Sequence, residues 1–473
     1  MTDGFSARTS DFAAEMSAEE ALMWRVAADP WLDPSGALLV LTDQPVDRGL
    51  LRAKLAAGLV EIPRLAERVA ESSNPLEAPR WELDPHFDLD GHIIERTVPA
   101  PGDHRAVLDL VARLQAEPFP EGRPPWLIVL ITGLADGRGA MLSRLHHAVA
   151  DGIGSLRMAE IYLDLERTTE APAPVDLEAI LAERRANAEP PPPTDTADVL
   201  INALAGPFGL MKSAAAELAL IGADPARAQR TGSEALDTLR TVADQLAGDP
   251  YLDSTSELWT GRSGQRYYLT AQMPLDAAKA AAKRRGGTVN DLFVTALADT
   301  AVAYHADHDA VPRSVAMSFV RSTREGTGVG GNAFVPVKVR APGGDTTPDD
   351  RFAALHDAMA PSDAAEEPGL DAVSSLAGLI PTAMLTKLGR DQGKRIDIVT
   401  SNIRGAPFPI YIGGARVDAG YPIGPIAGAA CNATVMSYDG SLDIGVMIDP
   451  AAIEDPDRFG ELLQQVLDGY AAE

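Results

Sequence analysis

Two continuous apolar stretches stand out early in the chain, at residues 36–42 (GALLVLT) and 127–134 (LIVLITGL). Short apolar runs rich in branched aliphatic residues predict buried strands. A third run, residues 140–146, follows the polar sequence ADGRG, which is typical of a tight turn. These runs therefore predict a hairpin or a pair of neighbouring strands between residues 127 and 146.

Segments with helical periodicity surround these strands. Apolar residues recur at helical spacing in residues 17–29, 47–60 and 104–116. Ser17 is followed three residues later by Glu20, which is the spacing of a capping box at a helix N-terminus. The first part of the chain thus alternates helices and strands, a pattern that predicts an α/β fold.

The composition changes after residue 168. The proline-rich sequences APAPVD and AEPPPPTDT predict a linker with room for one short helix, and the Ala/Leu-rich residues 196–248 predict helices. We therefore expect an N-terminal half at residues 1–180, a proline-rich and helical linker at 181–255, and a C-terminal half at 256–473. The strands expected in the C-terminal half are 265–274, 312–321, 332–340 and 441–449, and the expected helices are 275–285, 290–305, 348–358 and 456–470.

The charge and the cysteine content exclude several classes of function. The chain of 473 residues carries 41 Lys and Arg against 68 Asp and Glu, which gives 41 − 68 = −27. A chain this acidic repels phosphate backbones, so we expect no nucleic-acid partner. The single Cys431 allows no intrachain disulfide and no multi-cysteine zinc site, and we predict no metal centre. With no apolar signal segment or membrane span in the sequence, we expect a cytoplasmic protein, with peripheral membrane or lipid-droplet contact left open.

The clearest chemical motif is HHAVADG at residues 146–152, between an apolar run and an expected helix at 153–165. Two histidines at a strand end place an imidazole at the mouth of a sheet. Histidine has a pKa of about 6.5, so His147 can take a proton from a hydroxyl and return it near neutrality. Asp151 and Gly152 stand where the chain must turn. The alternative is that both histidines serve only packing.

The motif HHxxxDG resembles the active-site motif of the bacterial wax ester synthase/diacylglycerol acyltransferase family, which belongs to the chloramphenicol acetyltransferase-like superfamily. Further resemblances follow in the family's order along nearly the whole chain. They are Trp81 with Phe87-Asp88-Leu89 and His92, residues 98–102 (VPAPG), 123–126 (RPPW), Asn290-Asp291, Gly331-Asn332, 401–407 (SNIRGAP), Tyr421-Pro422, Asn432 and 437–440 (SYDG).

The resemblance implies two chloramphenicol-acetyltransferase-like α/β halves with an active-site tunnel between them. It implies an acyl-CoA-dependent O-acyltransferase that makes wax ester or triacylglycerol, with acyl-CoA as cosubstrate and no permanently bound cofactor. His147 would be the general base for direct attack on the thioester, while His146 supports its loop and Asp151 is structural. Asn290 would donate a hydrogen bond to the oxyanion, or would only cap the helix that starts there.

The phosphates of CoA call for basic residues near a tunnel mouth. The candidates in the second half are the clusters Lys283-Arg284-Arg285 and Lys394-Arg395, with Arg321 and Arg324 close to a glycine-rich loop, although solvated surface charge is the more usual explanation of such clusters. That loop, residues 326–331, matches G-x-G-x-x-G, but a strand follows it, so a dinucleotide site is not expected. Two other functions stay open: a related acyltransferase with another acceptor, and a non-catalytic lipid-binding or lipid-droplet protein.

Overall fold

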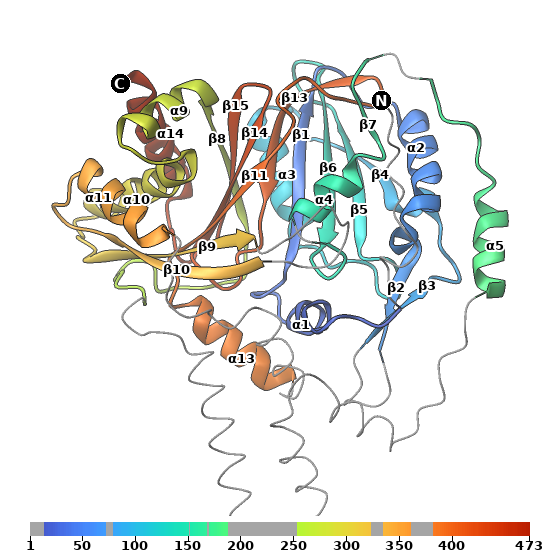
Figure 1. Ribbon diagram of the computed structural model, residues 1–473, viewed down its shortest axis with the longest axis horizontal. Helices are drawn as coiled ribbons and strands as arrows, with labels where there is room; N and C mark the ends of the chain where they lie inside the picture. The colour runs from blue at the N-terminus through green and yellow to red at the C-terminus, as the bar shows by residue number, and fades with distance from the viewer. Residues whose placement is uncertain are drawn as a thin grey trace, which may run out of the picture.

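Two β-sheets with helices packed on their faces make up the protein (Figure 1). The computed structural model describes residues 14–71, 79–150, 152–167, 170–187, 253–322, 334–360 and 382–473. The expected helical segment 196–248 and the glycine-rich loop 326–331 lie outside these residues. The α/β class predicted from the alternating pattern is confirmed.

A seven-stranded sheet has the order β4-β5-β6-β1-β13-β12-β7, and a six-stranded sheet has the order β10-β9-β11-β14-β15-β8. The strands of the first sheet are β4 (Ile93–Thr97), β5 (Trp126–Thr132), β6 (Gly139–His146), β1 (Ser35–Thr42), β13 (Ala415–Ile423), β12 (Tyr411–Ile412) and β7 (Leu163–Asp164). Those of the second are β10 (Phe334–Pro342), β9 (Ser314–Ser322), β11 (Ile398–Arg404), β14 (Cys431–Tyr438), β15 (Ser441–Ile448) and β8 (Tyr267–Pro274). Strands β2 (Glu67–Ala70) and β3 (Arg80–Leu83) form a separate pair.

The helices of the first half are α1 (Ala18–Val26), α2 (Arg48–Glu61), α3 (His104–Ala116), α4 (Gly152–Ala159) and α5 (Leu177–Asn187). Those of the second half are α9 (Leu275–Arg284), α10 (Val289–Asp307), α11 (Pro348–Met359), α13 (Thr382–Gly393) and α14 (Pro456–Ala472). The capping box predicted at Ser17 and Glu20 is present, with Ser17 N donating to Glu20 at 2.9 Å. The short turns η2 (Pro63–Ala66) and η3 (Leu89–His92) connect helices to strands.

Alternate residues of the central strands face two different cores, as the two-residue period of a strand requires. Val40 and Met141 belong to a core that α2 and α4 cover. Leu39 and Leu142 belong to another, which α3 shares with residues of the second sheet. On the opposite face of the second sheet, α9, α10, α11 and α14 bury a third core (Figure 1). Met436 and Tyr438 of the second sheet also belong to the first of these cores, so residues of the second sheet contact both faces of the first sheet.

Two strands from late in the chain complete the first sheet. β13 pairs antiparallel with β1, so that Leu39 lies opposite Tyr421, and β12 joins β13 to β7. Residues 411–423, which the sequence assigns to the C-terminal half, thus build the sheet of the N-terminal half. The pairing of β13 with β1 has a physical reason, because an uncovered edge of β1 would leave backbone N–H and C=O groups without partners.

The helix after the histidine motif is shorter than its sequence predicts. The periodicity indicates residues 153–165, whereas α4 ends at Ala159 and residues 163–164 form β7. Asp164 pairs with Tyr411 in β12, and its carboxylate forms an ion pair with Lys54 of α2. This pairing diverts the chain into the edge of the first sheet before the helix can continue.

Candidate active site

His147 directly follows β6, on the side that α2 and α4 cover. Ser143 and Leu145 of this strand and His147 after it line one cavity of about 580 Å³. A Cβ atom added at Gly36 of β1 would lie 3.5 Å from Nε2 of His147. The absent side chain at Gly36 therefore leaves space beside the imidazole.

His146 points into the protein instead. It is 3% exposed, and its Nδ1 accepts a hydrogen bond from the backbone N–H of Ala148 at 3.0 Å. An accepting Nδ1 leaves the proton of the neutral ring on Nε2. Burial lowers the pKa of His146 to about 4, and the neighbouring His147 acts in the same direction. His146 is therefore neutral at physiological pH and holds the turn that carries His147.

The part of the cavity on the first sheet is mostly apolar, although Ser143 and Arg144 also line it. Its floor consists of two transverse rows of paired residues from β5, β6 and β1, and the next row, which contains Met141, belongs to the closed core. Leu55 of α2 and Met158 of α4 lie on its wall. The two rows are Trp126–Leu145–Gly36 and Ile128–Ser143–Leu38. This apolar chamber extends along β6 away from His147.

Helices α1 and α13 form a second apolar wall. Leu22, Met23 and Val26 of α1 line the cavity, and Leu385 and Leu388 of α13 line it too. The two helices come from opposite halves of the chain and lie side by side (Figure 1). The cavity therefore runs between the halves, as the resemblance implies for the tunnel.

The part of the cavity on the second sheet is polar. Ser318, Val399 and Asn432 form one transverse row of β9, β11 and β14, and Ser401 and Thr434 belong to the next row. All five line the cavity. Hydroxyl and amide groups here can hydrogen-bond a polar ligand, which the chamber on the first sheet cannot do to the same extent.

The two parts meet at the end of β13. The carbonyl oxygen of Ile423 would lie 3.4 Å from a Cβ at Gly36, and the amide oxygen of Asn432 would lie 2.5 Å from a Cβ at Gly424. Asn432 itself is held by the carbonyl of Pro425, to which it donates at 2.9 Å. The polar part of the cavity thus begins close to the imidazole of His147.

Two family models match the chain. The model "Wax ester synthase/diacylglycerol acyltransferase catalytic domain" matches residues 16–293, and "WS/DGAT C-terminal domain" matches residues 330–470. The chain belongs to the wax ester synthase/diacylglycerol acyltransferase (WS/DGAT) family. The resemblance inferred from the motifs is confirmed, and the protein is an acyltransferase.

Relatives and solved structures agree with the WS/DGAT assignment. Two Mycobacterium tuberculosis proteins, each named "Putative diacyglycerol O-acyltransferase", are 30% identical to this chain. The first alignment covers 99% of this chain and 93% of the relative. The second covers 90% of this chain and 87% of the relative. The WS/DGAT structure from Marinobacter aquaeolei VT8 aligns with a TM-score of 0.62 at 20% identity, covering 97% of this chain and 100% of that one. The starter condensation domain of rhizomide synthetase, solved with C8-CoA, aligns with a TM-score of 0.52 at 15% identity, covering 98% and 95%. The two-lobed fold that the sequence implies is shared with both structures.

Asn290, the candidate from the second half of this WS/DGAT protein, does not line the cavity but contacts a residue that does. Its amide oxygen accepts a hydrogen bond at 3.2 Å from Nδ2 of Asn402, and Asn402 lies on the exposed rim of the cavity. The interpretation of Asn290 as the helix cap is wrong, because Thr288 caps α10 and forms a capping box with Asp291. Sequence reasoning missed Asn402 as a site residue, although it lies in the SNIRGAP motif.

The remaining sequence candidates are spread over the molecule. Asp151 lies outside the described residues, and Gly152 is the first residue of α4. Arg321 lies in β9, and the position of its side chain is not described. Lys283, Arg284 and Arg285 stand at the end of α9, beside α14 and the C-terminus, away from α1 and α13 (Figure 1). None of these three basic residues lines the cavity.

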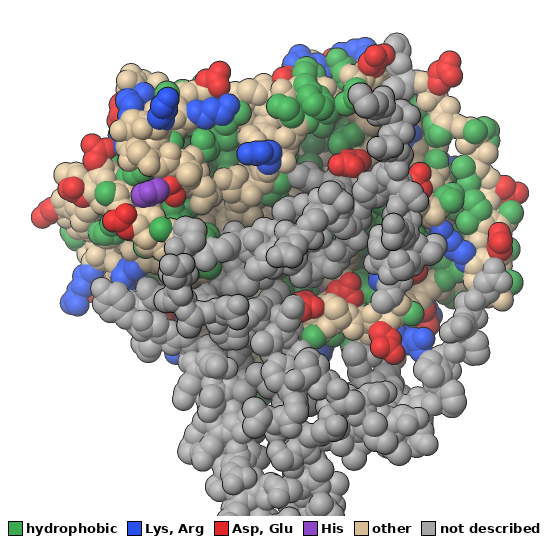
Figure 2. Space-filling model, in the orientation of Figure 1, with side chains coloured by type: hydrophobic (Ala, Val, Ile, Leu, Met, Phe, Trp, Pro, Cys, Tyr) green, Lys and Arg blue, Asp and Glu red, His purple; other side chains and the backbone are tan. Residues whose placement is uncertain are grey.

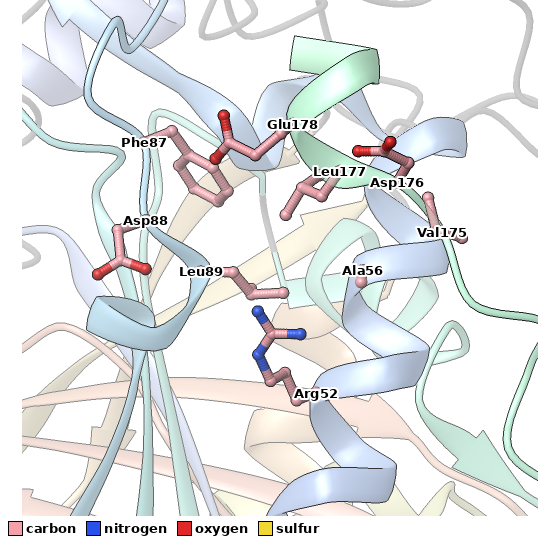
Figure 3. A pocket seen from close by; sticks show the side chains of 9 residues that line it. All are labelled: Arg52, Ala56, Phe87, Asp88, Leu89, Val175, Asp176, Leu177 and Glu178. Atoms are coloured by element: carbon pink, nitrogen blue, oxygen red, sulfur yellow. The ribbon is translucent and has the colours of Figure 1, made fainter.

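A second hollow of about 250 Å³ lies between α2, η3 and the start of α5 (Figure 3). Arg52 reaches into it from α2, and its Nε donates to both carboxylate oxygens of Asp90, at 3.1 and 3.0 Å. No residue of the histidine motif lines this hollow. Among the described residues, no three His, Cys, Asp or Glu side chains gather as a metal site requires, and no described helix is long and apolar enough to cross a bilayer.

Proposed function

We propose that this protein transfers the acyl group of a long-chain acyl-CoA to the hydroxyl group of a long-chain alcohol or a diacylglycerol, with His147 as general base. One observation carries the proposal: the imidazole of His147 lies on the wall of a largely apolar cavity that both halves of a WS/DGAT protein line. The names of the tuberculosis relatives and the C8-CoA bound to the condensation domain support the donor and the acceptor class.

The reaction needs one base and no acyl-enzyme. The ring of His147 removes the proton of the acceptor hydroxyl, and the oxygen attacks the thioester carbon. The tetrahedral intermediate then breaks its C–S bond, and the imidazolium returns the proton to the departing CoA sulfur. A positioned amide donor would stabilise the oxyanion, and Asn402, oriented by Asn290, is our candidate for that donor. His146 and Asp151 would hold the loop.

The apolar chamber beside β6 suits a hydrocarbon chain. Burial of each methylene group in it contributes about 0.8 kcal/mol. The wall of α1 and α13 offers a second apolar surface, so the cavity has room for the chains of both substrates. Peripheral contact with a membrane or a lipid droplet would deliver such substrates, and it remains part of this proposal.

The experiment that tests the function is the release of CoA thiol from palmitoyl-CoA by the full-length protein. Hexadecanol and dipalmitoylglycerol serve as alternative acceptors, and a reaction without acceptor gives the hydrolysis background. We expect release that depends on acceptor, with the ester identified by chromatography. Release with a short alcohol alone would point to a related transferase with another acceptor. Lipid binding without any release would instead contradict the enzyme function.

A methyl group at Gly36 should obstruct the base without disturbing the fold. In Gly36→Ala the new Cβ would lie 3.5 Å from Nε2 of His147 and 3.4 Å from the carbonyl oxygen of Ile423. These are ordinary contact distances, so the protein should fold, but the methyl group takes the space that the acceptor hydroxyl needs. We expect turnover to fall by about 10- to 100-fold, because small misplacements of reacting groups cost this much.

Gly469→Ala is the matched control for this variant. Gly469 lies in α14, and a Cβ there meets nothing within 4 Å. Alanine should leave turnover unchanged and favour the helix slightly. Equal turnover in the Gly36 and Gly469 variants would show that the acceptor does not approach His147 from the side of β1.

A further inference from the structure

The free edge of the second sheet places a lysine on the same face as the polar cavity lining. Lys338 of β10 pairs with Ser318 of β9, which pairs in turn with Val399 of β11 and, through it, with Asn432. Paired residues of adjacent strands project to the same face of a sheet. Ser318, Val399 and Asn432 line the cavity. Lys338 is therefore the last residue of a transverse row whose other three members line the cavity.

Lys338 also contacts the cavity lining directly. Its ammonium donates to Oε1 of Gln392 at 3.1 Å, and Gln392 of α13 is a lining residue. Among the residues that the structure describes, Lys338 has no carboxylate within ion-pair distance. Burial lowers the pKa of Lys338, the nearby carboxylate of Asp253 opposes this effect, and the charge of Arg395 adds to it.

Two arginines join Lys338 at this edge. Arg340, two residues along β10, donates to the backbone carbonyl of Asp253 at 3.1 Å, and Arg395 forms an ion pair with the carboxylate of Asp253 at 3.6 Å. The other carboxylate nearby, Asp397, is buried and accepts hydrogen bonds from Ser254 and from the backbone N–H of Ala316. We call Lys338, Arg340 and Arg395 the edge cluster.

We propose that the edge cluster binds the phosphate groups of the acyl-CoA donor. This inference rests on the proposed function, because it assumes a CoA thioester as substrate. Three cations that repel one another gain free energy when a polyanion joins them, and arginine forks match phosphate oxygens in geometry. The ligand class is therefore a nucleotide with several phosphates, held outside the polar part of the cavity.

The distance from the cavity to the edge cluster fits the donor. From Asn432 to Lys338 the row crosses three strand spacings, which amounts to about 14 Å. The pantetheine arm of CoA has a backbone about as long as four extended residues, which is also about 14 Å. Its amides and hydroxyl would lie along Ser318, Ser401 and Thr434, so the thioester would reach the end of β13, near His147.

The cluster indicated by the sequence, Lys283, Arg284 and Arg285, is less suited to phosphates. Nε of Arg285 contacts Asp349 at 2.8 Å, Nη2 of Arg285 contacts Glu473 at 2.7 Å, and Arg284 lies 3.7 Å from Glu473. Figure 2 shows basic side chains at the upper left, around α9, and others at the lower left, around β10, so the surface charge alone does not choose between the two places. Proximity to the cavity lining favours the edge cluster.

The test compares two donors that differ only in the nucleotide, palmitoyl-CoA and palmitoyl-pantetheine, in Lys338→Gln and Arg395→Gln. We expect each variant to raise KM for palmitoyl-CoA about tenfold, which is the loss of one charge-assisted hydrogen bond. The KM for palmitoyl-pantetheine should change less than twofold, which also shows that the variants fold. Lys279→Gln, a change of the same kind at an exposed position in α9, should alter neither KM.

Each other outcome overturns the inference. Equal KM changes for both donors would mean that the edge cluster acts on the fold or on the chemistry, and an increase with Arg284→Gln alone would move the phosphates to α9. If the wild-type protein transfers no acyl group, the proposed function is wrong, whereas the binding of CoA by the edge cluster is still to be tested. Calorimetric titration with CoA and with pantetheine then tests the edge cluster separately: Lys338→Gln should weaken only the binding of CoA, and unchanged CoA affinity would refute the inference.

Discussion

Alanine in place of His147 is expected to lower acceptor-dependent release of CoA from palmitoyl-CoA by about 100- to 10,000-fold, the range that a general base contributes. The acceptor hydroxyl then has no histidine among the described lining residues to take its proton. Among the described residues that line the cavity, His147 is the one histidine, the residue type that takes up and releases protons near neutral pH. The rate of the first turnover, measured by rapid quench, is the quantity to compare.

His86→Ala is the control for that variant. The imidazole of His86 is exposed, and this residue does not line the cavity. Its removal should leave turnover within twofold of the wild type. Both variants should give the wild-type circular dichroism spectrum. If the His147 variant kept full activity, another group would have to be the base, and the proposed mechanism would be wrong.

Arg351→Met should lower the free energy of unfolding by about 3–5 kcal/mol, the loss expected when one partner of a buried ion pair is removed. Arg351 is 3% exposed and pairs with Asp299 of α10, which also accepts from the hydroxyl of Tyr470. Its guanidinium donates to the carbonyl of Pro342 at 2.7 Å as well. The substitution therefore leaves a buried carboxylate and a backbone carbonyl without their cation.

The pH dependence of this loss provides an internal check. Burial already raises the pKa of Asp299, and Arg351 opposes that effect. Without Arg351 the pKa of Asp299 rises further in the folded protein only, so the folded variant binds more protons than its unfolded chain and gains stability as the pH falls. The difference from the wild type should be smaller at pH 5 than at pH 8.

Urea unfolding followed by tryptophan fluorescence, to which Trp259 of the same core contributes, measures this loss. Arg458→Met is the matched control, because Arg458 pairs with Asp307 at the surface, where both side chains are about one-third exposed. Exposed pairs contribute about 0–1 kcal/mol. An equal decrease in the free energy of unfolding in the two variants would show that the buried network stabilises the fold no more than a surface ion pair does.

The histidine motif proposed as the catalytic site was recognisable in the sequence because it is local. HHxxxDG requires only the end of one strand and the following turn, and both are written in consecutive residues. The edge cluster is different, since Lys338, Arg395 and Asp253 approach one another only when β10, β9 and β11 pair. The sequence shows charge density along the chain, so it drew attention to residues 283–285 and 394–395, where basic residues are consecutive, but it could not show that Arg395 lies near Lys338.

The prediction of strands likewise succeeded where the signal is local and failed where it depends on contacts distant in sequence. The continuous apolar runs at β1, β5 and β6 were predicted almost to their ends. Strand β13, with the sequence ARVDAGYPI, was not, because Gly420 and Pro422 ordinarily argue against a central strand. In the fold, Gly420 packs against Met436, whose terminal methyl group lies 2.4 Å from the place of a Cβ at position 420 and would have to move to admit a side chain. Contacts of this kind join residues of different strands, and single-sequence patterns carry no record of them.

The distance in sequence between β1 and β13 affects how the protein folds during its synthesis on the ribosome. Strand β1 is synthesised long before the residues that cover its edge, 415–423. Until those residues follow, the first sheet is open, and the backbone of β1 can pair with any extended chain. The nascent chain therefore depends on rapid completion or on a chaperone at that edge, and a truncated product ending before residue 415 would be prone to aggregate.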